Sequence, residues 1–181
     1  DWFNAIDFTY QMNNWGIGLP PASKNEENWP MIQPLLANPD LMPTPEDIQD
    51  AAAHFQEMLA IRRSSPLFRL QTAEDVISRL TFANTGPDQT PGAIVMLLSD
   101  LVGEELDPQY GMIVVVFNAT PDALTFEQAD LVGMPLMLHP LQVESNDPIV
   151  RAASFDAETG SFSVPARTTA VFVAADDSMA E

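Results

Sequence analysis

The sequence contains no cysteine, which excludes disulfides, cysteine nucleophiles and thiolate metal sites. It has only two histidines, His54 and His139, and neither lies in a His-x-x-His or His-Glu-x-x-His context. No phosphate-binding loop and no Gly-x-Ser-x-Gly pattern occurs. We therefore expect both histidines to be structural, and we expect no metal, no cofactor and no catalytic residue in this chain.

Basic residues are scarce. Seven Lys and Arg stand against 26 Asp and Glu, which gives a net charge of −19. Such a field repels nucleic acid phosphate and anionic lipid, so we expect neither nucleic acid nor membrane as a partner. A neutral ligand such as a sugar would be neither steered nor repelled.

Long hydrophobic runs are also absent, since no apolar stretch approaches the ~20 residues that span a bilayer. The first residues lack the charged and apolar segments of a signal peptide, and the chain does not begin with Met. We expect it to be part of a longer protein.

One helix is strongly indicated over residues 44–63. Thr44 is a candidate N-cap, Pro45 suits the first helical position, and Asp47 completes a capping-box-like Thr-x-x-Asp. The apolar residues Ile48, Ala51, Ala52, Phe55, Met58, Leu59 and Ile61 approximate a helical stripe. A short helix, broken by prolines, is predicted before it at 26–37, and a helical turn after it in TAEDVISRL.

Strands dominate the second part of the chain. Segments rich in β-branched and aromatic residues alternate with Gly, Pro, Asn and Asp clusters, as in antiparallel domains. Residues 156–162 (DAETGSF) indicate a hairpin turn in which Gly160 supplies positive φ. The predicted strands are 80–85, 93–100, 112–119, 123–128, 136–143, 161–166 and 169–175.

The predicted fold is therefore mainly β. A loop-and-helix segment at 1–70 precedes an antiparallel β-sandwich at 72–176, and residues 177–181 form a flexible tail.

The first thirty residues hold all three tryptophans and one of the two tyrosines, with many asparagines and no regular period. Asp1 and Asp7 lie among aromatic residues there. Aromatic faces with amide and carboxylate groups are what sugar recognition uses. The same aromatics could instead pack against the helix or the sandwich.

This opening resembles the bacterial pullulanase-type α-1,6-glucosidases, debranching enzymes of glycoside hydrolase family thirteen. The likeness rests first on DWFN, DFTY, Gly-x-Gly and Pro-Pro, and it covers nearly the whole chain. The matching stretches are 1–4, 7–10, 16–18, 20–21, 28–30, 62–69, 82–92, 113–120 and 164–173.

The resemblance implies that residues 1–70 are the terminal loop and helices of a catalytic (β/α)₈ barrel, against which the sandwich packs. Such a barrel takes ~250 residues, so most of it is absent, together with the three catalytic carboxylates. We expect the isolated chain to be inactive. Asp1, Trp2 and Asn4 would contact substrate only in the full enzyme.

The resemblance further implies that the full enzyme cleaves α-1,6 bonds in pullulan, amylopectin and limit dextrins, and that it is secreted or periplasmic. Partners would be the barrel of the same polypeptide, an α-glucan, or a second copy bound through surface that faces the barrel. An alternative function is a stand-alone α-glucan-binding β-sandwich.

Overall fold

The structure is a computed structural model that describes residues 6–13 and 18–175. The chain divides into two compact units, residues 1–56 and 57–181, and each is considered by itself. The sequence-based division into 1–70, 72–176 and a tail stays a prediction.

The first unit is built from short elements. Strands β1 (Ile6–Asp7) and β2 (Met12–Asn13) form an antiparallel hairpin. After them come α1 (Ala22–Asn25), η2 (Glu26–Asn28), α2 (Trp29–Leu36) and η3 (Pro39–Leu41). The helix predicted at 26–37 thus consists of η2 and α2, but the predicted break at the prolines is wrong, because Pro30 lies in the first turn of α2 and Pro34 inside it. The hairpin was not predicted, because two-residue strands leave no period in the sequence.

Helix α3 (Pro45–Ser64) begins as predicted. Thr44 and Asp47 form the reciprocal cap, in which the Asp47 N–H donates to Thr44 Oγ1 at 3.2 Å and the Thr44 N–H donates to Asp47 Oδ2 at 2.7 Å. Ile48 and Ile61 are buried, but Phe55 and Leu59, one turn apart, are 64% and 44% exposed. The apolar side chains in the middle of this stripe are therefore largely exposed to solvent.

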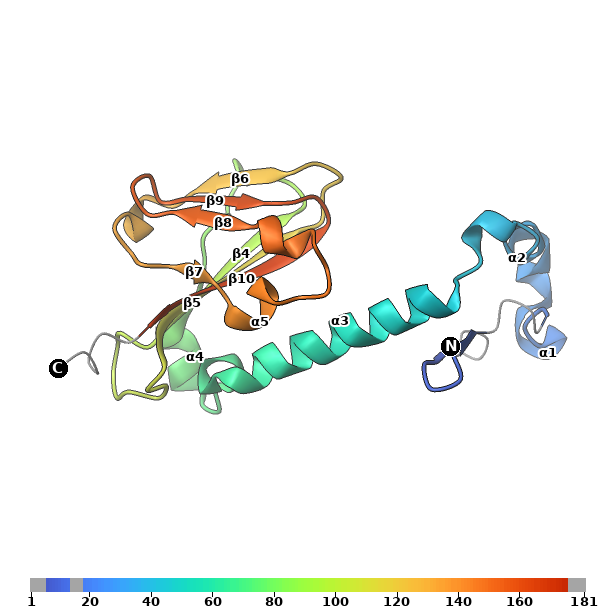
Figure 1. Ribbon diagram of the computed structural model, residues 1–181, viewed down its shortest axis with the longest axis horizontal. Coiled ribbons are helices and arrows are strands. Elements are labelled where there is room, and N and C mark those ends of the chain that lie inside the picture. Colours follow the sequence, from blue (N-terminus) through green and yellow to red (C-terminus); the bar gives the residue numbers. More distant parts are fainter. Residues whose placement is uncertain (1–5, 14–17, 176–181) are drawn as a thin grey trace. The chain divides into compact units, whose positions relative to one another are not determined.

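The second unit contains two antiparallel sheets (Figure 1). The five-stranded sheet has the order β3 (Leu80–Phe82), β4 (Ala93–Ser99), β5 (Tyr110–Asn118), β10 (Thr168–Ala175), β7 (Met137–Leu138). The three-stranded sheet has the order β6 (Leu124–Glu127), β9 (Ser161–Val164), β8 (Ser154–Asp156). The remaining elements are η4 (Pro66–Arg69), α4 (Ala73–Arg79), η5 (Ala129–Leu131), α5 (Pro140–Val143) and η6 (Val150–Ala152).

The core lies between the two sheets. Phe162 of β9 and Phe172 of β10 are fully buried, and their rings meet edge to face with centroids 5.0 Å apart. Phe155 of β8 packs against Phe162 with tilted rings whose centroids are 4.6 Å apart. Such aromatic pairs add about 0.5–1.5 kcal/mol beyond the area that they bury. This ring cluster joins the layers.

Three expectations need correction. The fold is mixed rather than mainly β, because helices make up most of the chain before β3. The predicted strand at 136–143 ends after Leu138, because Pro140 has no N–H for a sheet and instead starts α5, which His139 caps. Strand β8 was not predicted, although the hairpin turn at 156–162 that joins it to β9 is confirmed.

The turn before β9 gives a first prediction. Gly160 has φ +69°, and a Cβ there would lie 2.6 Å from the carbonyl oxygen of Gln128. Gly133 has φ +85° and open space around its would-be Cβ. We expect Gly133→Ala to lose about 1–2 kcal/mol of unfolding free energy from backbone strain alone, and Gly160→Ala clearly more. Urea denaturation of both variants measures this, and equal losses would contradict a clash at Gln128.

Candidate functional site

The three residues expected to contact substrate, Asp1, Trp2 and Asn4, lie outside the described residues. The hairpin that follows them is described. Its turn carries two exposed aromatic rings, Phe8 at 49% and Tyr10 at 76% exposure.

Hydrogen bonds hold this turn. Asp7 Oδ1 accepts from the Thr9 hydroxyl, from the Thr9 N–H at 2.9 Å and from the Tyr10 N–H at 3.2 Å. These bonds, with that from the Thr9 hydroxyl the largest, lower the pKa of Asp7 below its usual value and keep it ionised. Gln49 of α3 donates its side-chain N–H to the Phe8 carbonyl. The rings therefore project from a turn with a defined backbone.

A second candidate is the outer face, which we define as the face of the five-stranded sheet opposite the three-stranded sheet. Ile61 of α3 and Leu67 of η4 cover one part of it. The strand register places Ile94 beside Phe117 farther along the same face. Phe82, which pairs with Met96, lies there too.

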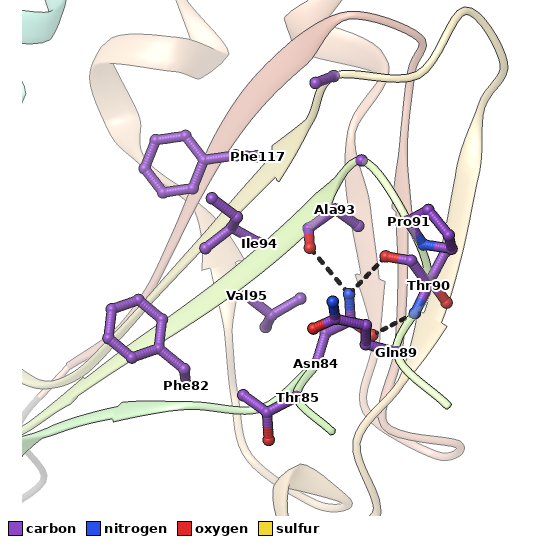
Figure 2. A pocket seen from close by; sticks show the side chains of 12 residues that line it. Phe82, Asn84, Thr85, Gln89, Thr90, Pro91, Ala93, Ile94, Val95 and Phe117 are labelled. Carbon is purple, nitrogen blue, oxygen red and sulfur yellow. Dashed lines mark hydrogen bonds between the residues drawn. The ribbon is translucent and has the colours of Figure 1, made fainter. Parts of the chain in front are cut away.

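Phe82, Ile94 and Phe117 together form what we call the bare row. Phe82 and Ile94 are 50% and 53% exposed, and Phe117 is half-buried. Figure 2 shows the three side chains projecting to one side of strands β3, β4 and β5. An apolar row at this level of exposure marks an incompletely covered surface.

The bare row borders a pocket of about 520 Å³ (Figure 2). The loop after β3 forms its polar side, where Asn84 donates to the carbonyls of Thr90 and Ala93, both at 2.8 Å, and accepts from the Thr90 N–H at 2.8 Å. The amide of Asn84 is thus used within the chain. None of the residues that line the pocket is charged.

His139 and Ser64 lie close together without forming a catalytic pair. The Leu141 N–H donates to His139 Nδ1 at 3.2 Å, so the neutral ring carries its proton on Nε2 and donates it to Ser64 Oγ, 3.0 Å away. The serine hydroxyl in turn donates to the Ile61 carbonyl at 2.8 Å. Because the histidine is the donor, it cannot act as a base toward this serine.

Buried charge is also used for structure. Arg79 forms an ion pair with Asp100 and donates to the Glu104 carbonyl. Asp100 further accepts from the N–H groups of Leu106 and Asp107, at 2.8 and 2.7 Å. Asp107 accepts from the Ser65 hydroxyl. These bonds fix the segment after α3 and the loop before β5.

Asn118, which with Thr120 fits a glycosylation triplet, is 3% exposed. Its amide donates to the carbonyls of Asp122 and Pro165, at 2.8 and 2.9 Å. A group with these bonds cannot carry a glycan in the folded chain. Among the described residues, no cluster of three or more His, Asp or Glu forms a metal site, and none of the helices could cross a membrane.

Comparison with known proteins places the chain in a family. The model of the pullulanase-type α-1,6-glucosidases, C-terminal region, matches residues 10–175. The chain belongs to this family.

Relatives within and beyond bacteria support the assignment. The chain is 48% identical over 178 residues to chloroplastic pullulanase 1 of Arabidopsis thaliana, covering 96% of itself and 18% of that protein. It is 32% identical over 175 residues to a Klebsiella pneumoniae pullulanase, covering 94% and 16%. The crystal structure of the maltotriose complex of PulA from Klebsiella pneumoniae superposes with a TM-score of 0.84 at 33% identity, over 97% of this chain and 19% of that one.

The chain thus spans less than a fifth of the length of these relatives, so the family domain is one part of larger pullulanase chains. Six phenylalanines lie in the strands of this unit, namely Phe82, Phe117, Phe126, Phe155, Phe162 and Phe172. Only the last two are fully buried. The exposed end of the outer face could not be found from the sequence, because β4 and β5 are apolar on both faces over most of their length.

His139 gives a prediction for pH. Burial lowers its pKa below 6.5, so below about pH 7 the unfolded chain binds a proton more readily than the folded one. We expect the unfolding free energy to fall between pH 7.5 and 5.5, with a slope of at most about 1.4 kcal/mol per pH unit. In His139→Asn this slope should be lost, and in His54→Asn, at an exposed position, it should persist. A slope unchanged in His139→Asn would refute the assignment.

Asn118 gives a prediction for stability. Asn118→Asp removes the amide donor and leaves buried carbonyls without a partner next to a buried carboxylate, which keeps only the two hydrogen bonds that Thr120 now donates to Asn118 Oδ1. The expected loss of unfolding free energy is about 3 kcal/mol or more. Asn146→Asp, in an exposed loop, should change it by less than about 0.5 kcal/mol. Similar denaturation midpoints for the two variants would contradict this role of Asn118.

Proposed function

We propose that this chain is the structural C-terminal domain of a debranching hydrolase, and that its outer face covers apolar surface of the catalytic part of the same polypeptide. The full enzyme would cleave α-1,6-glucosidic bonds in pullulan, amylopectin and limit dextrins with retention, through a carboxylate pair that this chain does not supply. Export of the full protein to the periplasm or medium stays a prediction.

One observation carries this proposal: the outer face is covered in one part and bare in the next. Ile61 and Leu67 bury Leu98, Ile113 and Val173, whereas the bare row continues the same surface without cover. At ~25 cal/mol per Å² of apolar area, exposure of these side chains is unfavourable unless another surface covers them. Because this chain spans less than a fifth of its relatives, the rest of a full-length protein can supply that surface.

Charge supports a protein partner on this face. In a chain with a net charge of −19, the pocket beside the bare row is lined by uncharged residues only. Surfaces that become buried avoid unpaired charges, because removing a charge from water costs several kcal/mol.

The alternative, glucan binding by the sandwich, has less support. The pocket is mainly apolar, and the amide of Asn84 already bonds within the loop. The polar side chains left for a sugar beside the rings of Phe82 and Phe117 are those of Thr85, Gln89 and Thr90.

A charge placed in the bare row tests the proposal. In the full-length enzyme, we expect Ile94→Glu to destabilise the docked domain by about 3–5 kcal/mol and to lower the melting temperature and the pullulanase activity. In the isolated chain, where Ile94 is half exposed, the same change should alter stability by less than about 0.5 kcal/mol.

Thr125→Glu, at an exposed position of the three-stranded sheet, is the matched control and should leave stability and activity unchanged in the full-length enzyme and stability unchanged in the isolated chain. The isolated chain should release no reducing sugar from pullulan. Equal effects of Ile94→Glu in both forms would refute docking through this face. If Ile94→Glu instead abolished retardation of the isolated chain in an amylopectin gel, the binding-module alternative would be favoured.

A further inference from the structure

The hairpin turn at residues 7–11 combines exposed aromatic and polar side chains, unlike the outer face. Tyr10 is the most exposed large aromatic side chain among the described residues, and Phe8 lies two positions before it. Between and beside the rings are Asp7, Thr9 and Gln11, all of them exposed. Aromatic and polar side chains thus alternate along the turn.

This turn is held before any ligand arrives. Asp7 Oδ1 accepts three hydrogen bonds from Thr9 and Tyr10, and the strand pairs Ile6 with Asn13 and Asp7 with Met12 close the hairpin. Gln49 of α3 fixes the Phe8 carbonyl. Aromatic side chains on a fixed backbone have only two rotatable bonds to order, so binding through them costs little conformational entropy.

The chemistry favours a neutral, hydroxylated ligand. An aromatic ring packs on the C–H face of a pyranose, and flanking hydroxyl, amide and carboxylate groups can bond to its hydroxyls. A docking surface for protein would instead be broad and mainly apolar, as the outer face is. The negative charge of the chain also disfavours anionic ligands but does not affect a neutral glucan.

We propose that Tyr10, with Phe8 beside it, stacks on glucosyl units of an α-glucan and forms a binding subsite. The choice of α-glucan rests on the function proposed above, and the stacking geometry rests on the turn itself. Tyr10 is a binding residue in this assignment and has no part in proton transfer or nucleophilic attack.

The test uses the full-length enzyme with Tyr10→Ala and Tyr10→Phe, and Ile77→Ala as a control at another highly exposed apolar position. We expect Tyr10→Ala to raise KM for pullulan, and to weaken retardation in amylopectin gels, by about 3- to 10-fold. The values of kcat and melting temperature should not change. Tyr10→Phe keeps the ring and should retain most of the affinity, and Ile77→Ala should behave as the unmodified enzyme.

Each other result contradicts the inference or the function on which it rests. If KM and retardation are unchanged in Tyr10→Ala, the subsite is refuted while the proposed function stands. A lower melting temperature with unchanged KM would show that Tyr10 packs against protein, which also refutes it. If the full-length protein does not cleave pullulan but Tyr10→Ala still abolishes retardation by amylopectin, the proposed function fails and the subsite is supported.

Discussion

The second unit depends on a sheet that is apolar on both faces and must be covered on both. Strands β5 and β10 form its centre, and Val114, Val116 and Phe172 face one side while Ile113, Val115 and Val171 face the other. Each such side chain contributes about 1.5–3 kcal/mol only when it is removed from water. The three-stranded sheet covers the first side through Phe162. The end of α3 and η4 cover the second side in part, so the structure is complete on one face and incomplete on the other.

Buried polar groups hold the covering segments in place. Ser65 stands between α3 and η4, and its bond to Asp107 ties that junction to the loop before β5. Arg79, at the end of α4, is tied to the same loop through Asp100. Removing one partner of a buried ion pair such as Arg79 and Asp100 is strongly destabilising, because it leaves an uncompensated buried charge. These bonds account for buried ionisable groups that could otherwise be mistaken for an active site.

The sequence predicted those features that short-range rules determine. The Thr44 cap, the start of α3 and the positive φ of Gly160 depend on residues a few positions apart, and all three are confirmed. The strand predicted at 136–143 was too long, because hydrophobicity alone cannot show where Pro140 and a capping His139 start a helix. The bare row could not be predicted either. Whether Ile94 is exposed depends on where α3 and η4 end on the sheet, which is a long-range property.

The exposed surfaces of the chain differ in a way that separates covering from binding. Several of the acidic residues that carry the net charge have local structural roles. Asp7, Asp47 and Asp75 each accept hydrogen bonds from a nearby threonine, and a bond of this kind is the largest cause of the lowered pKa of each. The pocket beside the bare row carries no charge at all. A face that is mainly apolar and uncharged gains by excluding water over its whole area. Isolated rings between polar groups on a fixed turn gain instead from a ligand that is itself half apolar and half hydroxylated. If both proposals above hold, this domain would serve a hydrolase of neutral polysaccharides in two ways, by completing a protein surface and by holding the polymer.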